Sequence, residues 1–389
     1  RTTLGQQVAR VTTALCLGLV ITIAITAAYI ARQQATTRAE AEISGIAANM
    51  AERLDARMFE RYREVRNLAA LEPLKDIWAG EPAQIRSVME QLQTSLPEYA
   101  WIGFALPDGT VKAATGGMLE GLSVAARPWF IDGSLGPTVK DVHDAKLLAE
   151  MLPAQADGEP FRFVDVAVPV TDSAGVTTGV LGAHMSWTWA NVVRQTVLQA
   201  TDTTMATDIW VLAADGTALL GPPYGTMPFD QQTLDAINDG SRTAFRHAAD
   251  SGEQLVAAVA TSGYLDYPGL GWTVVASRPL SQALAPANQL ALVIVLMGVA
   301  VAAFGALAAN LLARHLTGPL AELAFSIDRI GRDPGATMIA RDHTSRDVSL
   351  LTVSMRSLLR RLGTAESAHE AAQREALFTK QQLVEKTQR

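Results

Sequence analysis

Two long apolar runs without charged residues constrain this chain more than any other feature. The first spans residues 11–31 and the second spans residues 290–313. A helix rises about 1.5 Å per residue, so each run is long enough to cross the roughly 30 Å hydrocarbon core of a bilayer. More than 250 residues of ordinary polar and apolar composition separate the two runs. The sequence therefore predicts two transmembrane helices that flank a large domain.

Each apolar run has a second interpretation. The first is longer than the apolar region of a usual signal peptide, about 7–15 residues, and no clear cleavage motif follows Ala31, so we expect a retained anchor. The second could be a buried core helix, but it has no polar face, and Gly298 and Gly305 suit close helix contacts in lipid. Cys16 is the only cysteine and lies in the first run, which excludes an intrachain disulfide in the outer domain.

Charge predicts the orientation of the chain in the membrane. Residues 314–389 carry a net charge of +3 and residues 1–10 carry +2, which leaves −12 for residues 11–313 out of a total of −7. Basic residues beside membrane helices favour the cytoplasm, although Arg32 and Arg278 oppose this tendency. We expect both ends in the cytoplasm and an acidic domain outside. The total charge gives no indication of nucleic-acid binding.

The outer domain begins with helical periodicity. Apolar residues recur at steps of three and four over residues 33–71. Glu72-Pro73 is predicted to end this helix, because proline disfavours the helical conformation in the residue before it. A second amphipathic stretch covers residues 83–96. The period then changes to two, which predicts antiparallel strands within residues 101–114, 162–170 and 176–187.

The strand pattern occurs twice. Ile102–Thr110 aligns with Ile209–Thr217 at an offset of 107 residues, and both segments contain an Asp-Gly turn. A later pair of strands also recurs, with Asp165–Thr171 and Gly179–Ser186 matched by Leu255–Thr261 and Gly271–Arg278. Two elements in the same order indicate a duplicated module. We expect a membrane-distal module at about 72–200 and a membrane-proximal one at about 201–280.

Three short motifs carry a resemblance to a known family. They are Arg127-Pro128-Trp129-Phe130 after the first hairpin, Gly179-Val180-Leu181-Gly182, and Gly271-Trp272-Thr273-Val274-Val275. Together with a long helix between two membrane spans, residues 33–286 resemble the double CACHE sensor domain of bacterial receptors. The resemblance implies an α+β fold, with two antiparallel-sheet, PAS-like modules on one long helix, and it implies binding of a small molecule in the distal module.

The residues after the second apolar run resemble a HAMP domain. Thr317-Gly318-Pro319-Leu320 is expected to open its first helix, residues 331–345 to connect, and residues 347–362 to form its second helix. The family usually has Asp-Glu at the start of that second helix, where this chain has Asp347-Val348. The resemblance implies a cytoplasmic helical bundle, and the charged helical residues after it are expected to form a coiled coil to an output domain outside this chain.

These observations predict the following organisation. The cytoplasmic N-terminus is residues 1–10, the transmembrane helices are 11–31 and 287–313, the extracytoplasmic sensor is 32–286, HAMP is 314–363 and the coiled coil is 364–389.

Arg127 is the first candidate ligand-binding residue. A guanidinium presents a fork of donors that matches a carboxylate or another planar anion. Trp129 and Phe130 could wall the pocket and stack on an apolar or cationic ligand. The plainer interpretations are an ion pair between Arg127 and Asp132 on the surface, and a Trp129 that belongs to the core.

Four further candidates follow the motif. Asp141 and His143 lie on a segment expected to close the pocket, and Asp165 and His184 lie on the two later strands. In amino-acid-binding members of the family, an Asp on the strand after the Gly-Val-Leu-Gly motif stands where this chain has His184, and a Tyr stands where it has Leu122. Both differences argue against a free α-amino acid. The expected ligand is a carboxylate, an amine or a purine-like molecule, although acidic loop residues are often merely solvated and His184 could be a satisfied core histidine.

No metal, cofactor or catalytic activity is expected. The run Asp141-x-His143-Asp144 contains ligating residue types but is too short to be diagnostic of a metal site. The sequence has no Gly-x-Ser-x-Gly elbow and no phosphate-binding loop with lysine. His369-Glu370 is superficially similar to a histidine-kinase phosphoacceptor, but the residues that follow do not match that motif.

The sequence thus predicts the sensory and signal-transfer part of a homodimeric bacterial receptor in the inner membrane, with a periplasmic sensor. Its partners are a small molecule, a second copy of the chain and the membrane. The output domain is expected to be a diguanylate cyclase or a histidine kinase. The alternative function is an extracytoplasmic protein-interaction or adhesion module of a membrane receptor.

Overall fold

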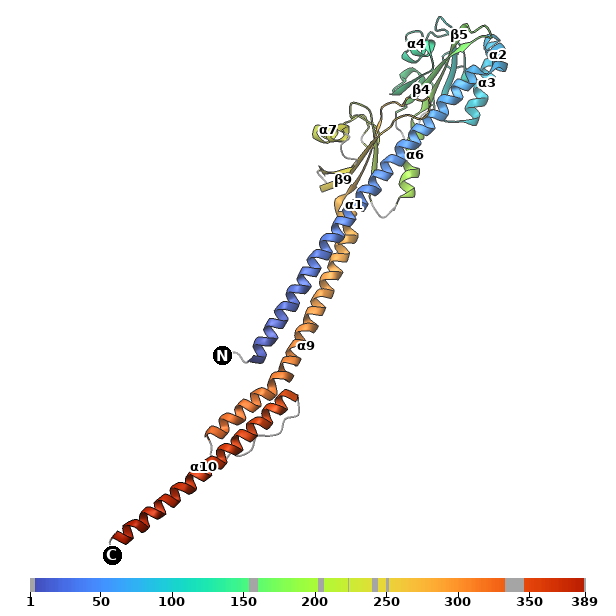
Figure 1. Ribbon diagram of the computed structural model, residues 1–389. Coiled ribbons are helices and arrows are strands. Elements are labelled where there is room, and N and C mark those ends of the chain that lie inside the picture. The colour runs from blue at the N-terminus through green and yellow to red at the C-terminus, as the bar shows by residue number, and fades with distance from the viewer. Residues whose placement is uncertain are drawn as a thin grey trace. The chain divides into compact units, whose positions relative to one another are not determined.

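The computed structural model (Figure 1) has two compact units, residues 32–288 and residues 1–31 together with 289–389. The residues that it describes are 4–153, 160–201, 206–222, 224–239, 244–249, 252–332 and 346–387.

Helix α1 (Leu4–Ala70) supports the whole sensor unit. Its predicted apolar stripe is buried, and Ile43, Met50 and Leu54 are fully inaccessible to solvent. The helix ends at Ala70, and Pro73 follows in the short turn η1 (Glu72–Leu74). The expected end of the helix at Glu72-Pro73 is therefore confirmed, because proline cannot continue the ladder of backbone hydrogen bonds.

The distal part of the unit holds five strands and several short helices. Its strands are β1 (Tyr99–Ala105), β2 (Val111–Ala114), β3 (Thr138–His143), β4 (Phe163–Thr171) and β5 (Thr177–Ser186). Its helices are α2 (Lys75–Ala79), α3 (Pro82–Ser95), η2 (Thr115–Gly117), α4 (Pro128–Leu135), α5 (Lys146–Ala149) and α6 (Thr188–Ala200). Proline stands in the first turn of α3 and of α4, where its missing N–H costs nothing and its fixed φ suits the helix.

The proximal part repeats this strand arrangement with fewer helices among the described residues. They are β6 (Asp208–Leu212), β7 (Ala218–Leu220), α7 (Gln231–Asp239), β8 (Ala244–Ala249), β9 (Gly252–Ala260), β10 (Thr273–Pro279) and α8 (Leu280–Ala283). The distal sheet has the order β2-β1-β5-β4-β3 and the proximal sheet the order β7-β6-β10-β9-β8. All neighbouring strands are antiparallel. The two orders are identical once the strands are renumbered, so the predicted α+β fold and its internal repeat are confirmed.

One core cluster joins α1 to both sheets, which lie along this helix in Figure 1. It contains Ile102 of β1 and Ile209 of β6 together with the apolar stripe of α1. Each sheet also has an outer face, turned away from α1. We call the apolar residues there the distal outer cluster, which includes Trp101 and Trp129, and the proximal outer cluster. The proximal cluster is Leu212, Ala218, Phe229, Leu234, Ile237, Val256 and Val275.

Specific contacts join the two modules. The rings of Trp187 and Trp272 meet edge to face with centroids 4.9 Å apart. The carbonyl oxygen of Leu219 accepts a hydrogen bond from Trp187 Nε1 at 2.7 Å and another from the Arg162 guanidinium at 2.8 Å. Arg162 also lies over the ring of Tyr224, 4.1 Å from its centroid. The modules therefore share aromatic packing and directed hydrogen bonds, which favours their moving together.

The other unit contains the two long apolar runs. Windows long and apolar enough to cross a membrane lie within Ala9–Ala70 and Ala285–His315, with mean hydropathies of 2.3 and 2.7, and none of either window is buried. Such continuous apolar surface is unfavourable in water and favourable in lipid. A Cβ added to Gly298 would lie 3.1 Å from Val20, so the helices approach closely there. These helices fit the two predicted transmembrane segments.

Helix α9 (Ala285–Arg332) continues past the predicted start of the HAMP domain without a break. Thr317 Oγ1 donates to the carbonyl oxygen of Ala313 at 2.6 Å, and the helix runs on through Gly318 and Pro319. Helix α10 (Arg346–Thr387) likewise runs through Gly363. Most of the predicted connector, residues 333–345, lies outside the described residues. The HAMP domain and its boundaries therefore stay a prediction.

Candidate ligand-binding site

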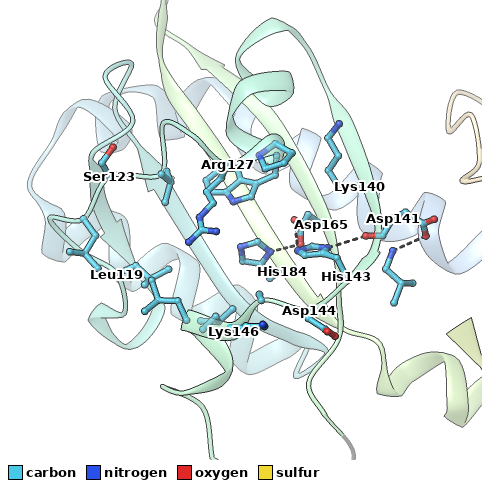
Figure 2. Close-up of a pocket in the computed structure, with 18 residues that line it drawn as sticks. Leu119, Ser123, Arg127, Lys140, Asp141, His143, Asp144, Lys146, Asp165 and His184 are labelled. Carbon is cyan, nitrogen blue, oxygen red and sulfur yellow. Dashed lines mark hydrogen bonds and ion pairs between the residues drawn. The ribbon is translucent and has the colours of Figure 1, made fainter. Parts of the chain in front are cut away.

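A cavity of about 640 Å³ lies on the outer face of the distal sheet (Figure 2). This volume is in the range typical of small-molecule sites. Residues from the loop after η2, from α4, β3 and α5, and from strands β4 and β5 surround it. They are Leu119, Leu122, Ser123, Val124, Arg127, Pro128, Trp129, Lys140, Asp141, Val142, His143, Asp144, Ala145, Lys146, Leu147, Leu148, Asp165 and His184.

Strand geometry places Asp165 and His184 together at the inner wall. They are direct partners across β4 and β5, so their side chains project from the same face. Their neighbours Val164 and Ala183 alternate to the opposite face and join the core along α1. Asp165 Oδ1 and His184 Nδ1 form a short hydrogen bond, and the two residues are only 2 % and 6 % exposed. The rest of the buried stretches of β4 and β5, residues 163–168 and 179–185, is apolar, so this is a buried polar pair in apolar surroundings.

His143 joins this pair from the end of β3. Its Nε2 lies 3.3 Å from Asp165 Oδ2, while its Nδ1 lies 3.0 Å from the carbonyl oxygen of Asp141. The side chain is 38 % exposed, so it forms the rim of the cavity rather than its floor. Asp165 consequently contacts one imidazole at each carboxylate oxygen, as the dashed lines in Figure 2 show.

Aromatic rings enclose the pair. The ring centroids of Trp101 and Trp129 lie 5.0 Å and 5.8 Å from that of His184. Two glycines create the space for these rings. A Cβ on Gly182 would lie 2.5 Å from Trp129, and one on Gly103 would lie 2.2 Å from Trp101. The second glycine of the Gly-Val-Leu-Gly motif therefore lets a tryptophan lie directly on the sheet.

Arg127 provides positive charge on the opposite side. It precedes α4 in an extended conformation, is exposed, and points its guanidinium into the cavity (Figure 2). The surface ion pair with Asp132 that the sequence allows is not formed, since Asp132 pairs with Lys140 instead. Among the described residues, the guanidinium of Arg127 has no hydrogen-bond or ion-pair partner, although its backbone is hydrogen-bonded to Val124, Phe130 and Ile131. It is a cation held in place by the chain but not neutralised by it.

Asp141 borders the cavity, but its carboxylate serves another purpose. Oδ1 accepts hydrogen bonds from Trp272 Nε1 of the proximal module and from its neighbour's backbone N–H, both at 2.7 Å. Figure 2 shows this side chain turned away from His184. The Asp141 carboxylate therefore links the two modules in this structure, and its expected contact with a ligand stays a prediction.

Phe130 does not line the cavity. It is 6 % exposed and packs edge to face on Trp129, with centroids 5.9 Å apart. Consecutive helical residues point about 100° apart, so Trp129 and Phe130 cannot both face the ligand. The structure places Phe130 behind the wall rather than in it. The other six predicted residues, Arg127, Trp129, Asp141, His143, Asp165 and His184, all line the cavity.

Sequence reasoning missed Lys146 and the apolar side of the cavity. Lys146 begins α5 and is exposed at the cavity, where it adds a second cation on the ligand side. Leu119, in the loop after η2, has a positive φ of 67° and lines the cavity. A single lysine or leucine in a loop carries no sequence signal of binding. The resulting site combines cations, a buried carboxylate with two imidazoles, and aromatic walls, which suits a small polar molecule with an anionic group.

No protein-family model and no curated protein matches the chain. Similar solved structures are ligand-binding domains of bacterial chemoreceptors. That of Pseudomonas aeruginosa PctC, in complex with GABA, has 17% identity and a TM-score of 0.45, and the match covers 61% of this chain and 99% of that domain. That of Pseudomonas fluorescens CtaA, with L-isoleucine, has 17% identity, a TM-score of 0.45 and coverages of 65% and 98%. That of Campylobacter jejuni Tlp3, with 4-methylisoleucine, has 10% identity, a TM-score of 0.48 and coverages of 64% and 94%. At these levels the ligands of those domains say nothing about the ligand of this chain.

Proposed function

We propose that this chain senses a small extracytoplasmic molecule and transmits the signal across the membrane as part of a homodimeric bacterial receptor. The observation that carries the proposal is the unpaired guanidinium of Arg127 inside a cavity whose far wall is the Asp165–His184 pair. A carboxylate on the ligand would neutralise Arg127, since the two groups match in charge and planar geometry. The imidazoles would bind a second polar group, because a histidine both donates and accepts hydrogen bonds.

The proposed route to the membrane follows the chain. Strand β3 forms one wall of the cavity, and its residue Asp141 accepts a hydrogen bond from Trp272 Nε1. Trp272 directly precedes β10, which leads through α8 into α9. If β3 and β10 move together between two positions, a ligand that binds one of these states more tightly would shift the population toward that state.

The proposed cytoplasmic device is a HAMP bundle with two helices from each protomer. Helix α10 exposes Leu350, Val353, Leu358 and Leu362, each between 57 % and 65 % accessible. A row of exposed apolar residues at helical spacing needs a partner, and a second copy of the chain would cover it. We place the output, a diguanylate cyclase or a histidine kinase, outside these 389 residues, and the sensor itself catalyses no reaction.

The test of ligand binding is a thermal-unfolding screen of the full chain in detergent micelles, followed by tryptophan fluorescence. The panel contains carboxylates, amines, amino acids and purines. A ligand present at 100 times its Kd stabilises the folded state by about 2.7 kcal/mol and raises the Tm measurably. Arg127→Ala should abolish the shift. Arg246→Ala, an exposed arginine on β8 of the proximal sheet, is the matched control and should retain it.

A folded chain whose Tm responds to nothing in the panel would contradict the proposal. It would favour the alternative function, recognition of a protein partner at the outer domain. Dimerisation is tested separately with Leu358→Cys in a Cys16→Ser background. Oxidation should then produce a disulfide-linked dimer, and a chain that stays monomeric would exclude the proposed bundle.

A further inference from the structure

His143, Asp165 and His184 bring two imidazoles and one carboxylate together at the inner wall of the cavity, and these are groups that bind metal ions. One ligating atom from each of His143, Asp165 and His184 lies within 4.8 Å of the others. Asp165 and His184 are buried, and His143 closes the group from the cavity side. The three residues lie on three different strands, so the sheet holds their backbones in a fixed arrangement. A rigid scaffold of this kind suits metal binding.

The hydrogen bonding of His143 defines which of its nitrogens is free. Its Nδ1 lies 3.0 Å from the carbonyl oxygen of Asp141, and a carbonyl oxygen only accepts. The proton of a neutral His143 is therefore on Nδ1, which leaves a lone pair on Nε2. That lone pair faces Asp165 Oδ2 at 3.3 Å. Two acceptors at this distance repel each other unless a proton or a metal ion lies between them.

The same arrangement is typical of metal-ligating histidines. Such a histidine donates its second ring N–H to a carboxylate or a backbone carbonyl, which fixes both tautomer and ring orientation. The Asp141 carbonyl would perform this role for His143. Two imidazoles and one carboxylate are also a common set of three protein ligands for Zn²⁺, with the remaining position open to water or a ligand. Magnesium and calcium prefer oxygen ligands throughout, so they fit this set poorly.

We propose that His143, Asp165 and His184 bind a divalent transition-metal ion, with Zn²⁺ as the best-fitting ion, at the inner wall of the distal cavity. This goes against the expectation of no metal from the sequence. His143, Asp165 and His184 are 22 and 19 residues apart in the chain, and only the sheet brings them together. The proposal deepens the proposed function and rests on it for its signalling meaning. A carboxylate ligand held by Arg127 would then face a cation on the opposite wall.

The test uses the full chain in detergent micelles, purified without a histidine tag and stripped with a chelator. Zn²⁺ is titrated by calorimetry, bound metal is counted by elemental analysis after dialysis, and Co²⁺ is added to a second sample to read ligand geometry from its visible absorption. We expect one Zn²⁺ per chain, a Co²⁺ spectrum with nitrogen ligands, and no binding of Mg²⁺.

Three variants locate the site. Asp165→Asn keeps the shape of the side chain but removes its charge, and His184→Gln removes an imidazole. Each should weaken Zn²⁺ binding at least about 100-fold, since loss of even an indirect contact to a metal ligand costs 10–100-fold. His247→Gln is the matched control, because His247 lies on β8 of the proximal sheet and contacts Thr233 instead. It should bind Zn²⁺ as the unaltered chain does.

The outcomes separate this proposal from the function on which it rests. Absence of stoichiometric Zn²⁺ binding, or equal weakening in His184→Gln and His247→Gln, overturns the metal site. If a carboxylate still raises the Tm in that case and Arg127→Ala abolishes the effect, the sensor function stands without the metal. Arg127→Ala should still bind one Zn²⁺ per chain, with an affinity at least equal to that of the unaltered chain, because a positive charge is removed from the same cavity. A variant that loses both metal and carboxylate would show that Arg127 supports the metal-binding residues, contrary to the arrangement proposed.

Discussion

The two modules of the sensor have the same strand order, but the outer face of one sheet carries a polar site and that of the other is apolar. In the distal module, the outer face carries Asp165 and His184 beneath a cavity. In the proximal module, Val256 and Val275 stand on that face and pack under Phe229 and helix α7. The repeated topology is therefore used once to hold a polar site and once to build a second core. A fold positions residues, but the residues themselves decide what the position does.

A single position of the repeat illustrates the difference. Gly103 in β1 aligns with Trp210 in β6 at the 107-residue offset. The glycine leaves room for the ring of Trp101, which lies beside His184. In the proximal module the tryptophan occupies this place itself, and its ring packs on Phe229 with centroids 5.4 Å apart. Space is kept open in one copy and filled in the other.

The largest expected effect comes from Phe229→Ala in the proximal outer cluster. Removing a buried phenylalanine should lower the free energy of unfolding by about 3–5 kcal/mol through lost burial and a residual cavity. Ligand affinity in the distal cavity should change less than about 2-fold, since no contact is lost there. Denaturant unfolding and calorimetric titration measure the two quantities. A large loss of affinity with little loss of stability would reverse the roles assigned to the modules.

Gly182→Val should fill the distal face and make it resemble the proximal one. The added side chain would meet Trp129 at 2.5 Å, and such overpacking costs about 1–3 kcal/mol. It should also abolish ligand binding, because Trp129 must leave its place on the sheet. Gly45→Ala on α1 is the control, since an added Cβ there meets nothing within 4 Å and alanine favours a helix. Retained binding in Gly182→Val would show that the wall of the cavity does not depend on this packing.

Asp141 can be assigned to the cavity or to the junction between the modules by a pair of substitutions. Asp141→Ala leaves Trp272 Nε1 without an acceptor, which should lower the free energy of unfolding by about 1–2 kcal/mol. Asp141→Asn keeps an acceptor oxygen and should be nearly as stable as the unaltered chain, with unchanged ligand affinity. Thermal unfolding and titration of both variants provide the test. A marked loss of affinity in Asp141→Asn would instead make the carboxylate a direct ligand contact.

The smallest expected effect is a pH dependence of stability that arises from Asp55, which contacts Ser262 and Gly263 of the proximal module. Burial raises the pKa of Asp55 on α1, although the backbone N–H groups of Ser262 and Gly263 donate to its carboxylate and oppose the rise. A raised carboxyl pKa means that the folded state holds the proton more tightly than the unfolded state. Stability is therefore lost as pH rises from about the ordinary value of 3.8 through the raised one.

Asp55→Asn cannot ionise, so its stability relative to the unaltered chain should increase between pH 4 and pH 7. Unfolding free energies of both chains at several pH values in this window measure the change, and any pH-independent effect of the amide cancels in the comparison. A relative stability that falls with pH would mean that the two backbone donors outweigh burial. Ligand affinity in the distal cavity should be the same in both chains at each pH.

The sequence predicted those parts of the structure whose signals are local. The Asp-Gly turns after Ile102 and Ile209, the end of α1 at Pro73 and the paired strands β4 and β5 follow from periodicity and turn chemistry. The edge strand β3 did not, because only Val139 and Val142 are apolar in Thr138–His143, so this segment lacks the period-two alternation of a half-buried strand. The engagement of Asp141 by Trp272 joins residues 131 apart in the sequence, and no local pattern indicates such a contact.

The sequence likewise predicted the place of the candidate site but not how its side chains are arranged. The Arg-Pro-Trp-Phe motif located the cavity, yet it could not tell which of the two aromatic residues faces it, since that depends on how α4 sits on the sheet. The sequence predicts Asp165 and His184 as separate candidates on two strands. Only the register of β4 on β5 makes them partners, and only the course of β3 adds His143.

The long contact range of α1 has a consequence for how this protein is made. The buried stripe of α1 is synthesised first, but Glu42 reaches its partner Arg278 only across 236 residues, and Asp55 reaches Gly263 across 208. At a synthesis rate of about 5–20 residues per second, that stripe waits on the order of tens of seconds for its last partners. During this interval an apolar helix surface stays uncovered, so the nascent chain is at its most vulnerable to aggregation and proteolysis before β10 emerges. Truncations that remove β10 should consequently be rescued by a holding chaperone rather than by a ligand.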